Sequence, residues 1–490
     1  MSPGDKNTAM ALLRRNNQKT KRQRVIVVGA GSAGAVIAAR ISQNQDVNVL
    51  LLDAGPNISV ALEADGIQST NFVEALEVEN RNLRVPVRRT ASQGLSDYVR
   101  GTGTGGSSSV NAMVGMWGMA SDYDRWARDL GCDGWSWRDV APVFANLAVP
   151  LHTTLQSEWG NIDRALVEAA TDLGFERRND LSTAPLAGRG VGAVSLTITD
   201  GRRASVNDIY LEPARSRSNL EIRGNSTVDR LNMNGNGVVG VRLSNGSDID
   251  ADVVIVCAGA ISTPQILLRT NIQRSGIGRG VKDHPAVAFT LALKEPSRAR
   301  YAVSTLLRTT STTAGRHNDN SRSEQGDIHL LPLNHTTAHD NMHGAMFAAV
   351  MRVHSTGSIT STNIDLNLLS DERDMSVMTE ATSMLATMIE SQSFTGIARS
   401  VDNELSIDNK QDWLLNNVGS YSHIGCSSKM GAVTDENAVV DTSGKLIGYR
   451  GVWVCDASIF PDLPTGNTHL PVVMMAERIS QRISESLTPN

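Results

Sequence analysis

The residues best suited to chemistry begin with a G-x-G-x-x-G turn near the N-terminus, formed by Gly29, Gly31 and Gly34, with Ser32 and Ala33 between the last two. The first glycine permits a tight turn, the second allows a pyrophosphate to approach the backbone, and the third lets a helix pack on the preceding strand. The helix N-terminus would then face the phosphates. The pattern predicts a dinucleotide site, and a turn of purely structural role is the alternative.

Asp53 supports the dinucleotide interpretation, because it ends the next apolar run 19 residues after Gly34, where a carboxylate can bind ribose hydroxyls. The G-x-G-x-x-G turn fits FAD and NAD alike. A second glycine segment, from Arg100 to Asn111, favours FAD. Its residues have little Cβ bulk, so that its amides and hydroxyls can donate to a pyrophosphate and a flavin. A flexible linker is the alternative, but apolar and charged residues bound the segment closely. The contacts expected from it are Arg100, Gly105, Gly106, Ser107 and Asn111.

Four short apolar runs must position these residues. They are Val25–Val28, Val47–Leu52, Val253–Cys257 and Gly451–Cys455. The first two, with a helix expected over 35–42, predict a βαβ unit. Because the runs lie far apart in the sequence, we expect one nucleotide domain assembled from distant pieces, with other material inserted between them.

The inserted material differs in character. It is rich in Ser, Thr and Asn, alternates from Ser358 to Leu368, and has an amphipathic helical stretch from Asp371 to Ile389. We expect a substrate domain of α+β type built on an antiparallel sheet. The predicted organisation is a basic tail over 1–22, an N-terminal region with most of the FAD domain over 23–285, mainly the substrate domain over 286–416, and a C-terminal segment over 417–490 that returns to the FAD domain with the catalytic residues.

Length and composition limit the classes of protein to which the chain can belong. A chain of 490 residues can form two joined domains, and its net charge of -5 offers no basic surface for nucleic acid. No signal peptide or membrane span is indicated. Four widely spaced cysteines favour a reducing cytoplasm. No metal site is expected, and four histidines are interpreted as solvated or loop residues: His329, His335, His339 and His343.

The ordered motifs resemble the glucose–methanol–choline (GMC) oxidoreductase family over most of the chain. The segment 100–111 resembles that family's first signature and 259–268 its second, and 122–126, 283–285 and 456–458 are further similar segments. The resemblance implies a Rossmann-like, p-hydroxybenzoate-hydroxylase-like α/β FAD domain and a substrate domain with a six-stranded sheet.

The resemblance also implies roles for single residues. His423 aligns with the family's catalytic histidine and Asn467 with its partner. Oxidation of an alcohol needs a base for the hydroxyl proton, and an imidazole that titrates near neutrality is suitable, although a histidine judged alone is better interpreted as structural. Asn467 can donate to an alkoxide and accept from a hydroxyl, so the pair would contain one base. His469 aligns with a position near the flavin pyrimidine. Some members bind FAD covalently through a histidine at the position of Val110; valine cannot form that bond, so dissociable FAD is expected. Further FAD contacts are expected at Ala54, Val228, Ala258, Asp456, Ala457 and Thr468.

The sequence therefore predicts an FAD-dependent enzyme that oxidises the CH–OH group of a small-molecule alcohol and passes electrons to oxygen or another acceptor. Oxidase and dehydrogenase stay open, as do the alcohol and the oligomeric state. One alternative is a dehydrogenase of a mycofactocin-like redox carrier, because His469 and the compact N-terminal half resemble such members. A hydroxynitrile lyase without net redox chemistry and a non-catalytic FAD scaffold are the others.

Overall fold

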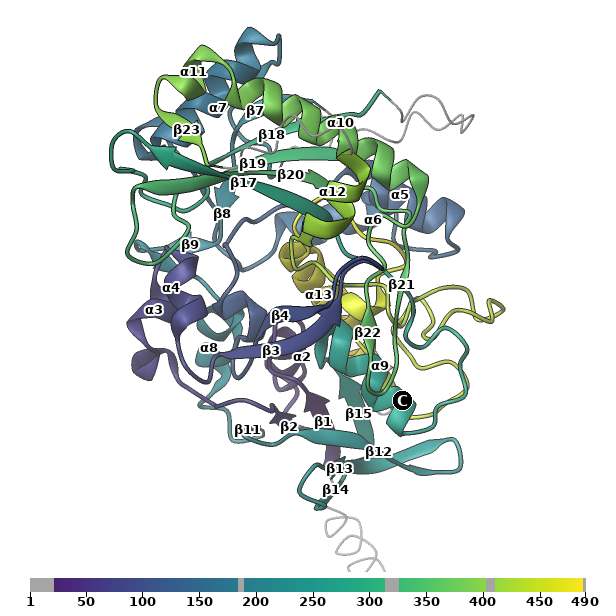
Figure 1. The fold of residues 1–490 in the computed structure, drawn as a ribbon. Coiled ribbons are helices and arrows are strands. Elements are labelled where there is room, and N and C mark those ends of the chain that lie inside the picture. Colours follow the sequence, from purple (N-terminus) through teal and green to yellow (C-terminus); the bar gives the residue numbers. More distant parts are fainter. Residues whose placement is uncertain (1–21, 184–188, 313–325, 402–409, 488–490) are drawn as a thin grey trace, which may run out of the picture.

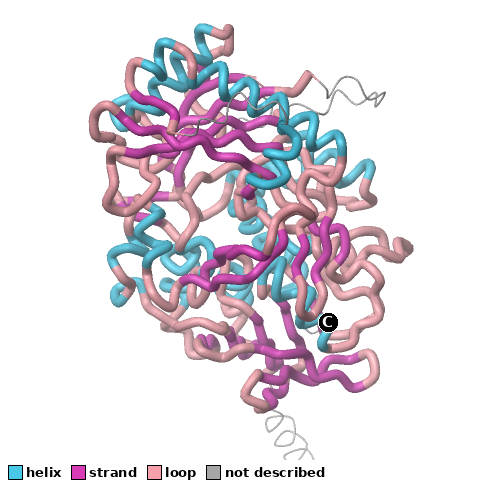
Figure 2. Tube along the Cα trace, in the orientation of Figure 1, coloured by secondary structure: helices cyan, strands magenta, loops and turns pink. Residues whose placement is uncertain are grey.

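The computed structural model describes residues 22–183, 189–312, 326–401 and 410–487 of the chain. The expected basic tail, apart from residue 22, lies outside the described residues. Figures 1 and 2 show one sheet near the bottom of the view, a second near the top, and helices between and outside them. In the described ranges, no helix is long and apolar enough to span a bilayer.

The lower sheet is parallel and unites segments from across the chain. Its strand order is β11-β2-β1-β15-β25, and every neighbouring pair is parallel. Apolar residues dominate β1, β2, β15 and β25 because the central strands are covered on both faces. The strands are β1 Gln23–Val28, β2 Val47–Leu52, β11 Leu220–Arg223, β15 Val253–Val256 and β25 Val452–Val454. The expected assembly of the four distant runs is confirmed.

Helices follow the strands where the sequence predicts them. Helix α2 (Gly34–Ile41) follows β1 and α9 (Gly259–Arg269) follows β15. The C-terminal helix α13 (His469–Leu487) packs against α2. The ends of the chain's sequence therefore meet on one face of the parallel sheet.

The upper sheet has the order β23-β17-β20-β19-β18-β7-β6, with β24 also paired to β17. Its pairs are antiparallel except β6–β7. The sheet has eight strands, whereas the resemblance implies six; two of the eight, β6 and β24, have only two residues each. The strands are β6 Arg177–Arg178, β7 Gly190–Ala193, β17 Pro285–Leu293, β18 Thr305–Thr309, β19 Ile328–Leu333, β20 His343–Val350, β23 Ala398–Ser400 and β24 Gly419–Ser420.

One face of the upper sheet packs on helices. Val287, Phe289, Leu330 and Met346 share a buried cluster with α7 (Asn161–Asp172) and α10 (Glu372–Ile389). The predicted amphipathic helix is thus confirmed, and the Asp371 side chain accepts from the Arg373 amide at its N-terminus. The opposite face is turned toward the parallel sheet (Figure 1).

The expected place of Ser358–Leu368 is wrong. This segment forms β21 (Gly357–Ile359) and β22 (Ile364–Asp365) of a third sheet, of order β16-β21-β22-β3-β4, and so does not join the upper sheet. Alternation predicts a half-buried strand but not its pairing partner. The remaining strands of this sheet are β3 Asn82–Arg88, β4 Leu95–Gly101 and β16 Arg279–Val281.

Shorter elements complete the described fold. A three-stranded sheet contains β12 (Val228–Asn234), β13 (Gly237–Leu243) and β14 (Asp248–Asp250). Two ribbons pair β5 His152–Thr153 with β8 Ser195–Leu196, and β9 Ile198–Thr199 with β10 Arg202–Arg203. Further helices are α3 Asp65–Gln68, α4 Phe72–Glu77, α5 Ala120–Asp129, α6 Trp137–Ala145, α8 Glu212–Ala214, α11 Gln392–Thr395 and α12 Lys410–Asn417.

Candidate active site

The three glycines of the first turn differ in what surrounds them. Gly29 has a φ of +100°, and a Cβ there would lie 2.4 Å from the Cys257 carbonyl oxygen. A Cβ on Gly34 would lie 1.8 Å from the Gly29 carbonyl oxygen. Around Gly31 the nearest atom would be the Gly106 Cα at 3.8 Å. The outer glycines are therefore required for packing, and the middle one leaves the backbone approachable.

The second glycine segment folds directly against this turn. The Gly105 amide donates to the Ala30 carbonyl at 2.9 Å. Gly105 and Gly106 have φ values of +92° and +51°, and a Cβ on Gly106 would lie 2.6 Å from the Gly31 Cα. The Ser107 hydroxyl accepts from the Gly101 amide at 3.2 Å. The structure thus brings the two predicted glycine segments into contact.

Asp53 connects the same two segments. Its Oδ2 accepts from the Ala30 amide at 2.7 Å, and its Oδ1 accepts from the amides of Gly55 and Gly103, both at 2.8 Å. A carboxylate has about four acceptor positions, so these three bonds leave capacity for one more. Asp53 therefore organises both loops, and its expected bond to ribose stays a prediction.

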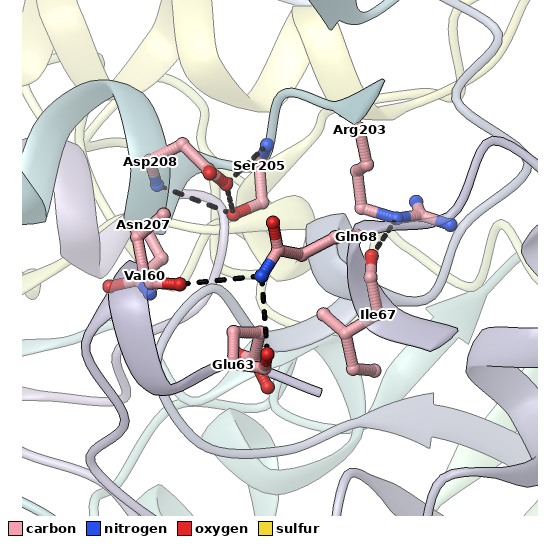
Figure 3. A pocket seen from close by; sticks show the side chains of 8 residues that line it. All are labelled: Val60, Glu63, Ile67, Gln68, Arg203, Ser205, Asn207 and Asp208. Atoms are coloured by element: carbon pink, nitrogen blue, oxygen red, sulfur yellow. Dashed lines mark hydrogen bonds between the residues drawn. The ribbon is translucent and has the colours of Figure 1, made fainter. Parts of the chain in front are cut away.

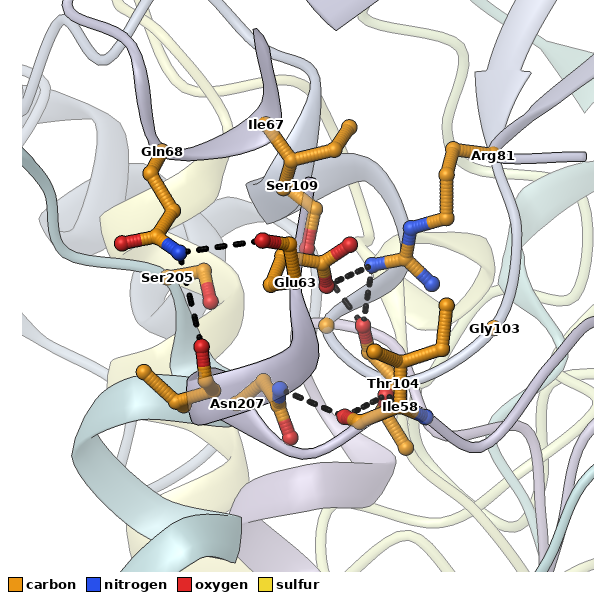
Figure 4. Close-up of polar contacts among 12 residues, drawn as sticks. Ile58, Glu63, Ile67, Gln68, Arg81, Gly103, Thr104, Ser109, Ser205 and Asn207 are labelled. Atoms are coloured by element: carbon orange, nitrogen blue, oxygen red, sulfur yellow. Dashed lines mark hydrogen bonds and ion pairs between the residues drawn. The ribbon is translucent and has the colours of Figure 1, made fainter. Parts of the chain in front are cut away.

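A buried ion pair between Arg81 and Glu63, which the sequence analysis missed, holds the second glycine segment in place (Figure 4). One Arg81 nitrogen lies 3.0 Å from Glu63 and donates to the Thr104 carbonyl at 2.7 Å, while the other donates to the Thr102 carbonyl. The two side chains are 2% and 6% exposed. Burial raises the pKa of Glu63 and lowers that of Arg81. Neither residue belongs to a sequence motif that we recognised, and only the fold brings them together.

The predicted contacts after β15 and β25 also lie near the first turn. A Cβ on Gly29 would approach the Ala258 Cα to 3.1 Å. Asp456 accepts from the Gly259 amide at the start of α9 and from the Thr263 hydroxyl, at 2.9 and 2.6 Å. Burial raises the pKa of this carboxyl. The Ala457 carbonyl accepts from the Cys426 amide, which links this strand end to the segment of His423.

Two predicted contacts have less distinctive surroundings. Val228 is buried at the start of β12, close to the Ser226 amide that donates to the Asp53 carbonyl at 2.7 Å. Ala54 follows Asp53 and is exposed. Val110 packs with Ile67 in a small apolar cluster.

His423 and Asn467 meet as the sequence predicts. The His423 Nε2 and the Asn467 Nδ2 are 3.3 Å apart, and His423 is 9% exposed. The His423 amide donates to Asp283 Oδ1 at 2.8 Å, and the Tyr98 hydroxyl donates to Asp283 Oδ2 at 2.6 Å. The preceding Ser422 has a left-handed φ of +61°. This constrained backbone holds the imidazole toward Asn467.

His284, expected to have a structural role, contacts the predicted base directly. The Nδ1 atoms of His284 and His423 lie 2.9 Å apart, with the rings nearly perpendicular at 89°. Burial lowers the pKa of His284 to about 3, and burial, His284 and Arg100 lower that of His423 well below its ordinary value. Both rings are neutral at neutral pH, and one Nδ1 must donate to the other. The signal available in the sequence was the Asp283-His284-Pro285 motif.

His329 contradicts its interpretation as a solvated or loop residue. It lies on β19 and is 1% exposed. Its cross-strand partner is Ala349, which pairs with Ala286, so all three share one face of the upper sheet, and Ala286 lies two residues after His284. Burial, Arg308, His284 and His423 lower its pKa. A single histidine in a short apolar run gave no periodicity from which this orientation could be predicted.

Other predicted contacts connect the glycine segments to the catalytic pair. Arg100 donates to the Ser422 carbonyl at 2.7 Å. Thr468 precedes α13, and its carbonyl accepts from the Val472 amide. His469 Nδ1 lies 3.2 Å from the Ser32 hydroxyl, and its buried Nε2 has no partner among the described residues. Burial, followed by Arg203, lowers the pKa of His469 to about 4.

These features fit a flavin dinucleotide. The approachable backbone at Gly31 lies at the start of α2, whose first amides suit a pyrophosphate. His469 lies two residues after Asn467, and its Nε2 has no partner among the described residues. A polar group of the flavin ring would find a hydrogen-bond partner in this nitrogen. The predicted cofactor positions thus extend from the glycine turn to the pair His423 and Asn467.

The chain matches known proteins along most of its length. Residues 23–286 and 350–476 match the N-terminal and C-terminal models of the GMC oxidoreductase family. The chain is 29% identical over 528 residues to an oxygen-dependent choline dehydrogenase of Paraburkholderia phytofirmans, covering 94% of this chain and 93% of that protein. The identity to the enzyme of the same name from Paraburkholderia xenovorans is 30% over 536 residues, with the same coverage.

Solved structures agree with the family match. A pyridoxine 4-oxidase from Mesorbium loti superposes with a TM-score of 0.84 and 25% identity, covering 94% of this chain and 99% of that chain. A formate oxidase shares the fold, with a TM-score of 0.81 and 18% identity over 96% and 100% of the two chains. With the flavin-compatible site described above, these matches show that the chain belongs to the GMC oxidoreductase family and is an FAD-dependent alcohol oxidoreductase.

Proposed function

We propose that this protein oxidises a small-molecule alcohol with His423 as the base and Asn467 as the group that positions the substrate oxygen. The observation that supports this assignment is the 3.3 Å separation of His423 Nε2 and Asn467 Nδ2, with Nδ1 of the same imidazole 2.9 Å from His284. The His423 ring therefore has a fixed orientation, and its Nε2 is directed to the Asn467 amide. A hydroxyl within hydrogen-bond distance of both groups would contact an acceptor and a donor at once.

The protonation states follow from the contacts. With the Asn467 amide nitrogen facing Nε2, this ring nitrogen of His423 is unprotonated and Nδ1–H donates to His284 Nδ1. His423 Nε2 then takes the hydroxyl proton, while the Asn467 amide donates to the oxygen and stabilises its developing charge. FAD, when bound, supplies the acceptor for the hydride of the alcohol carbon. The bond to His284 persists after protonation and holds the imidazolium in place.

The remaining assignments follow the same proposal. We assign the parallel-sheet domain to FAD binding of the p-hydroxybenzoate-hydroxylase-like type and the upper sheet to the substrate, with the boundaries 23–285, 286–416 and 417–490. The FAD contacts are those predicted from the sequence. Strands β6 and β7 of the upper sheet lie within 23–285, so this region would contribute to both domains. Oxygen or a redox carrier would reoxidise the flavin.

Val110 leads us to propose that FAD is dissociable, because a valine side chain cannot form a covalent bond to the flavin. Acid precipitation followed by absorbance of the supernatant tests this point. Flavin that stayed in the protein pellet would contradict it.

The decisive experiment is anaerobic flavin reduction by an alcohol identified in a substrate screen. His423→Ala should retain FAD and slow reduction by at least ~10²-fold, because general base catalysis contributes about that much. His343→Ala is the matched control, since His343 is half exposed and pairs with Asp340 away from this site. Near-unchanged reduction in His423→Ala would refute the assignment. Cyanide release from a cyanohydrin without flavin bleaching would instead favour a hydroxynitrile lyase.

A further inference from the structure

Arg203 is a fully buried guanidinium whose contacts are all to uncharged groups. It ends β10 and is 1% exposed. Its Nε donates to the Ile67 carbonyl at 2.9 Å (Figure 3). One terminal nitrogen donates to the Ser108 carbonyl at 3.3 Å and to the carbonyl and side-chain oxygens of Asn111 at 2.6 and 2.8 Å. The other terminal nitrogen has no partner among the described residues.

No carboxylate of the described chain lies within 4.0 Å of this guanidinium. Asp208 is the acidic residue whose charge raises the pKa of Arg203. That carboxylate, however, pairs with Arg202 at 2.6 Å and accepts from Ser205. Burial lowers the pKa of Arg203 to about 9, which leaves it charged at neutral pH. A buried cation without a counter-charge costs several kcal/mol. The fold therefore holds a positive charge that the described residues contact only through neutral oxygen acceptors.

The small cavity beside Arg203 has no room for a molecule that would supply a counter-charge. Its volume of about 10 Å³ is enough for a single water. In Figure 3 the terminal nitrogens of Arg203 point away from Ser205 and Asp208, which line this cavity. The charge is directed instead toward the Ser108–Asn111 segment.

Two further features give the same region a positive potential. The charge of Arg203 lowers the pKa of His469, whose buried Nε2 also has no hydrogen-bond partner among the described residues. His469 begins the 19-residue helix α13, and the N-terminus of a helix bears a partial positive charge. Asn467 of the catalytic pair lies two residues earlier. Arg203, which contacts Ser108 and Asn111 of the second glycine segment, is thus electrostatically coupled to the first residue of α13.

We propose that Arg203 compensates the negative charge that the flavin ring acquires during the reaction. When the alcohol gives its hydroxyl proton to His423 and its hydride to the neutral flavin, the products are a carbonyl compound, an imidazolium and a flavin with one negative charge. This inference rests on the proposed function of the site. Arg203 stabilises that anion relative to oxidised flavin, and therefore raises the flavin's reduction potential.

The test compares Arg203→Met and Arg203→Gln, which remove the charge, with Arg203→Lys, which keeps it. Arg202→Met is the matched control, because Arg202 lies next to it on β10 but pairs with Asp208. The readouts, made on FAD-loaded protein, are the two-electron midpoint potential and the dissociation constant of sulfite. Sulfite adds to oxidised flavin and leaves a negative charge on the ring, so it reports the same stabilisation without any alcohol.

The charge-removing variants should weaken sulfite binding at least ~10-fold and lower the midpoint potential by about 30 mV, which is a tenfold change for a two-electron couple. Arg203→Lys and Arg202→Met should stay within about threefold of the parent protein. Unchanged potential and sulfite affinity in both neutral variants would overturn the proposal. Weaker FAD retention with an unchanged potential of the bound fraction would also overturn it, since the charge would then serve the pyrophosphate.

These outcomes are separate from those of the proposed function. His423→Ala tests the base through the rate of flavin reduction, and Arg203 is tested through equilibrium properties. If His423→Ala proved fully active, the Arg203 measurements would still decide whether this charge acts on the flavin. A failure of Arg203→Met to fold leaves Arg203→Gln, whose amide can still donate to nearby carbonyls.

Discussion

The Nδ1 atoms of His284 and His423 lie 2.9 Å apart, so the nitrogen that fixes the predicted base is supplied by a second neutral imidazole. In many enzymes a carboxylate holds the orienting nitrogen of a catalytic histidine. Here the nearby carboxylate, Asp283, accepts instead from the backbone amides of His423 and His284. The orientation of the His423 ring therefore depends on its contact with His284. The rigidity of this pair depends on the Asp283 carboxylate, which accepts from the backbone amides of both residues.

The first prediction concerns His284. His284→Ala removes the acceptor of the His423 Nδ1–H and should slow anaerobic flavin reduction by about 10- to 100-fold, because a hydrogen bond to a charged group contributes about 1.5–3 kcal/mol. His284→Asn offers an oxygen acceptor and should recover much of the rate. FAD absorbance and circular dichroism check that both variants fold. Equal rates in His284→Ala and the parent protein would exclude a positioning role.

The second prediction is a pH profile. Because the pKa of His423 is lowered well below its ordinary value by burial, His284 and Arg100, the base is neutral at and above neutral pH. The rate of flavin reduction should be level between about pH 6 and 8 and fall as the pH drops through the lowered pKa. Arg100→Met removes a positive charge, raises this pKa and moves the fall to higher pH. Arg100→Lys keeps the charge and should keep the parent profile.

The third prediction concerns the Arg81–Glu63 pair behind the glycine segment. Arg81→Met leaves the Glu63 carboxylate buried and should lower the free energy of unfolding by about 3 kcal/mol, measured by urea denaturation of the FAD-loaded protein. Adding Glu63→Leu to it should restore part of the loss, since two apolar side chains leave no buried charge. The exposed pair Arg84–Asp97 provides the control: Arg84→Met should change stability by less than about 1 kcal/mol. Equal losses at both sites would contradict the buried pair's role.

The fourth prediction concerns substrate charge. Positive groups lower the pKa of two buried imidazoles: Arg100 acts on His423 and Arg308 on His329. A cationic alcohol placed at His423 would meet repulsion from these charges, so we expect kcat/KM for choline to be at least ~10-fold lower than for an uncharged alcohol of similar size. Steady-state assays at two ionic strengths check this expectation. A preference for choline would show that other residues dominate the charge around the bound alcohol.

Much of the nucleotide domain could be predicted because its signals are local. Gly29 and Asp53 follow strands whose apolar runs are plain in the sequence. The structure places Gly34 against Gly29 and bonds Asp53 to the amide of Ala30, which follows Gly29. His423 and Asn467 could be predicted only through the resemblance of their flanking segments to the motifs of the family. The pairing of Arg81 with Glu63, and the directions of His284 and His329, depend on contacts between distant segments, which no local pattern encodes. Arg203 was missed for the same reason.

The strand order of the parallel sheet also has a consequence for how the protein is made. β1 lies between β2 and β15, and β25 joins the far side of β15 only after 451 residues have been synthesised. Until then the edge of β15 has no neighbour and its apolar side chains lack their cover. Pairings of such sequence separation form slowly, and unpaired edges promote association between chains. We therefore expect the emerging chain to need protection until its last segment appears, and cofactor capture to be a late event of biogenesis.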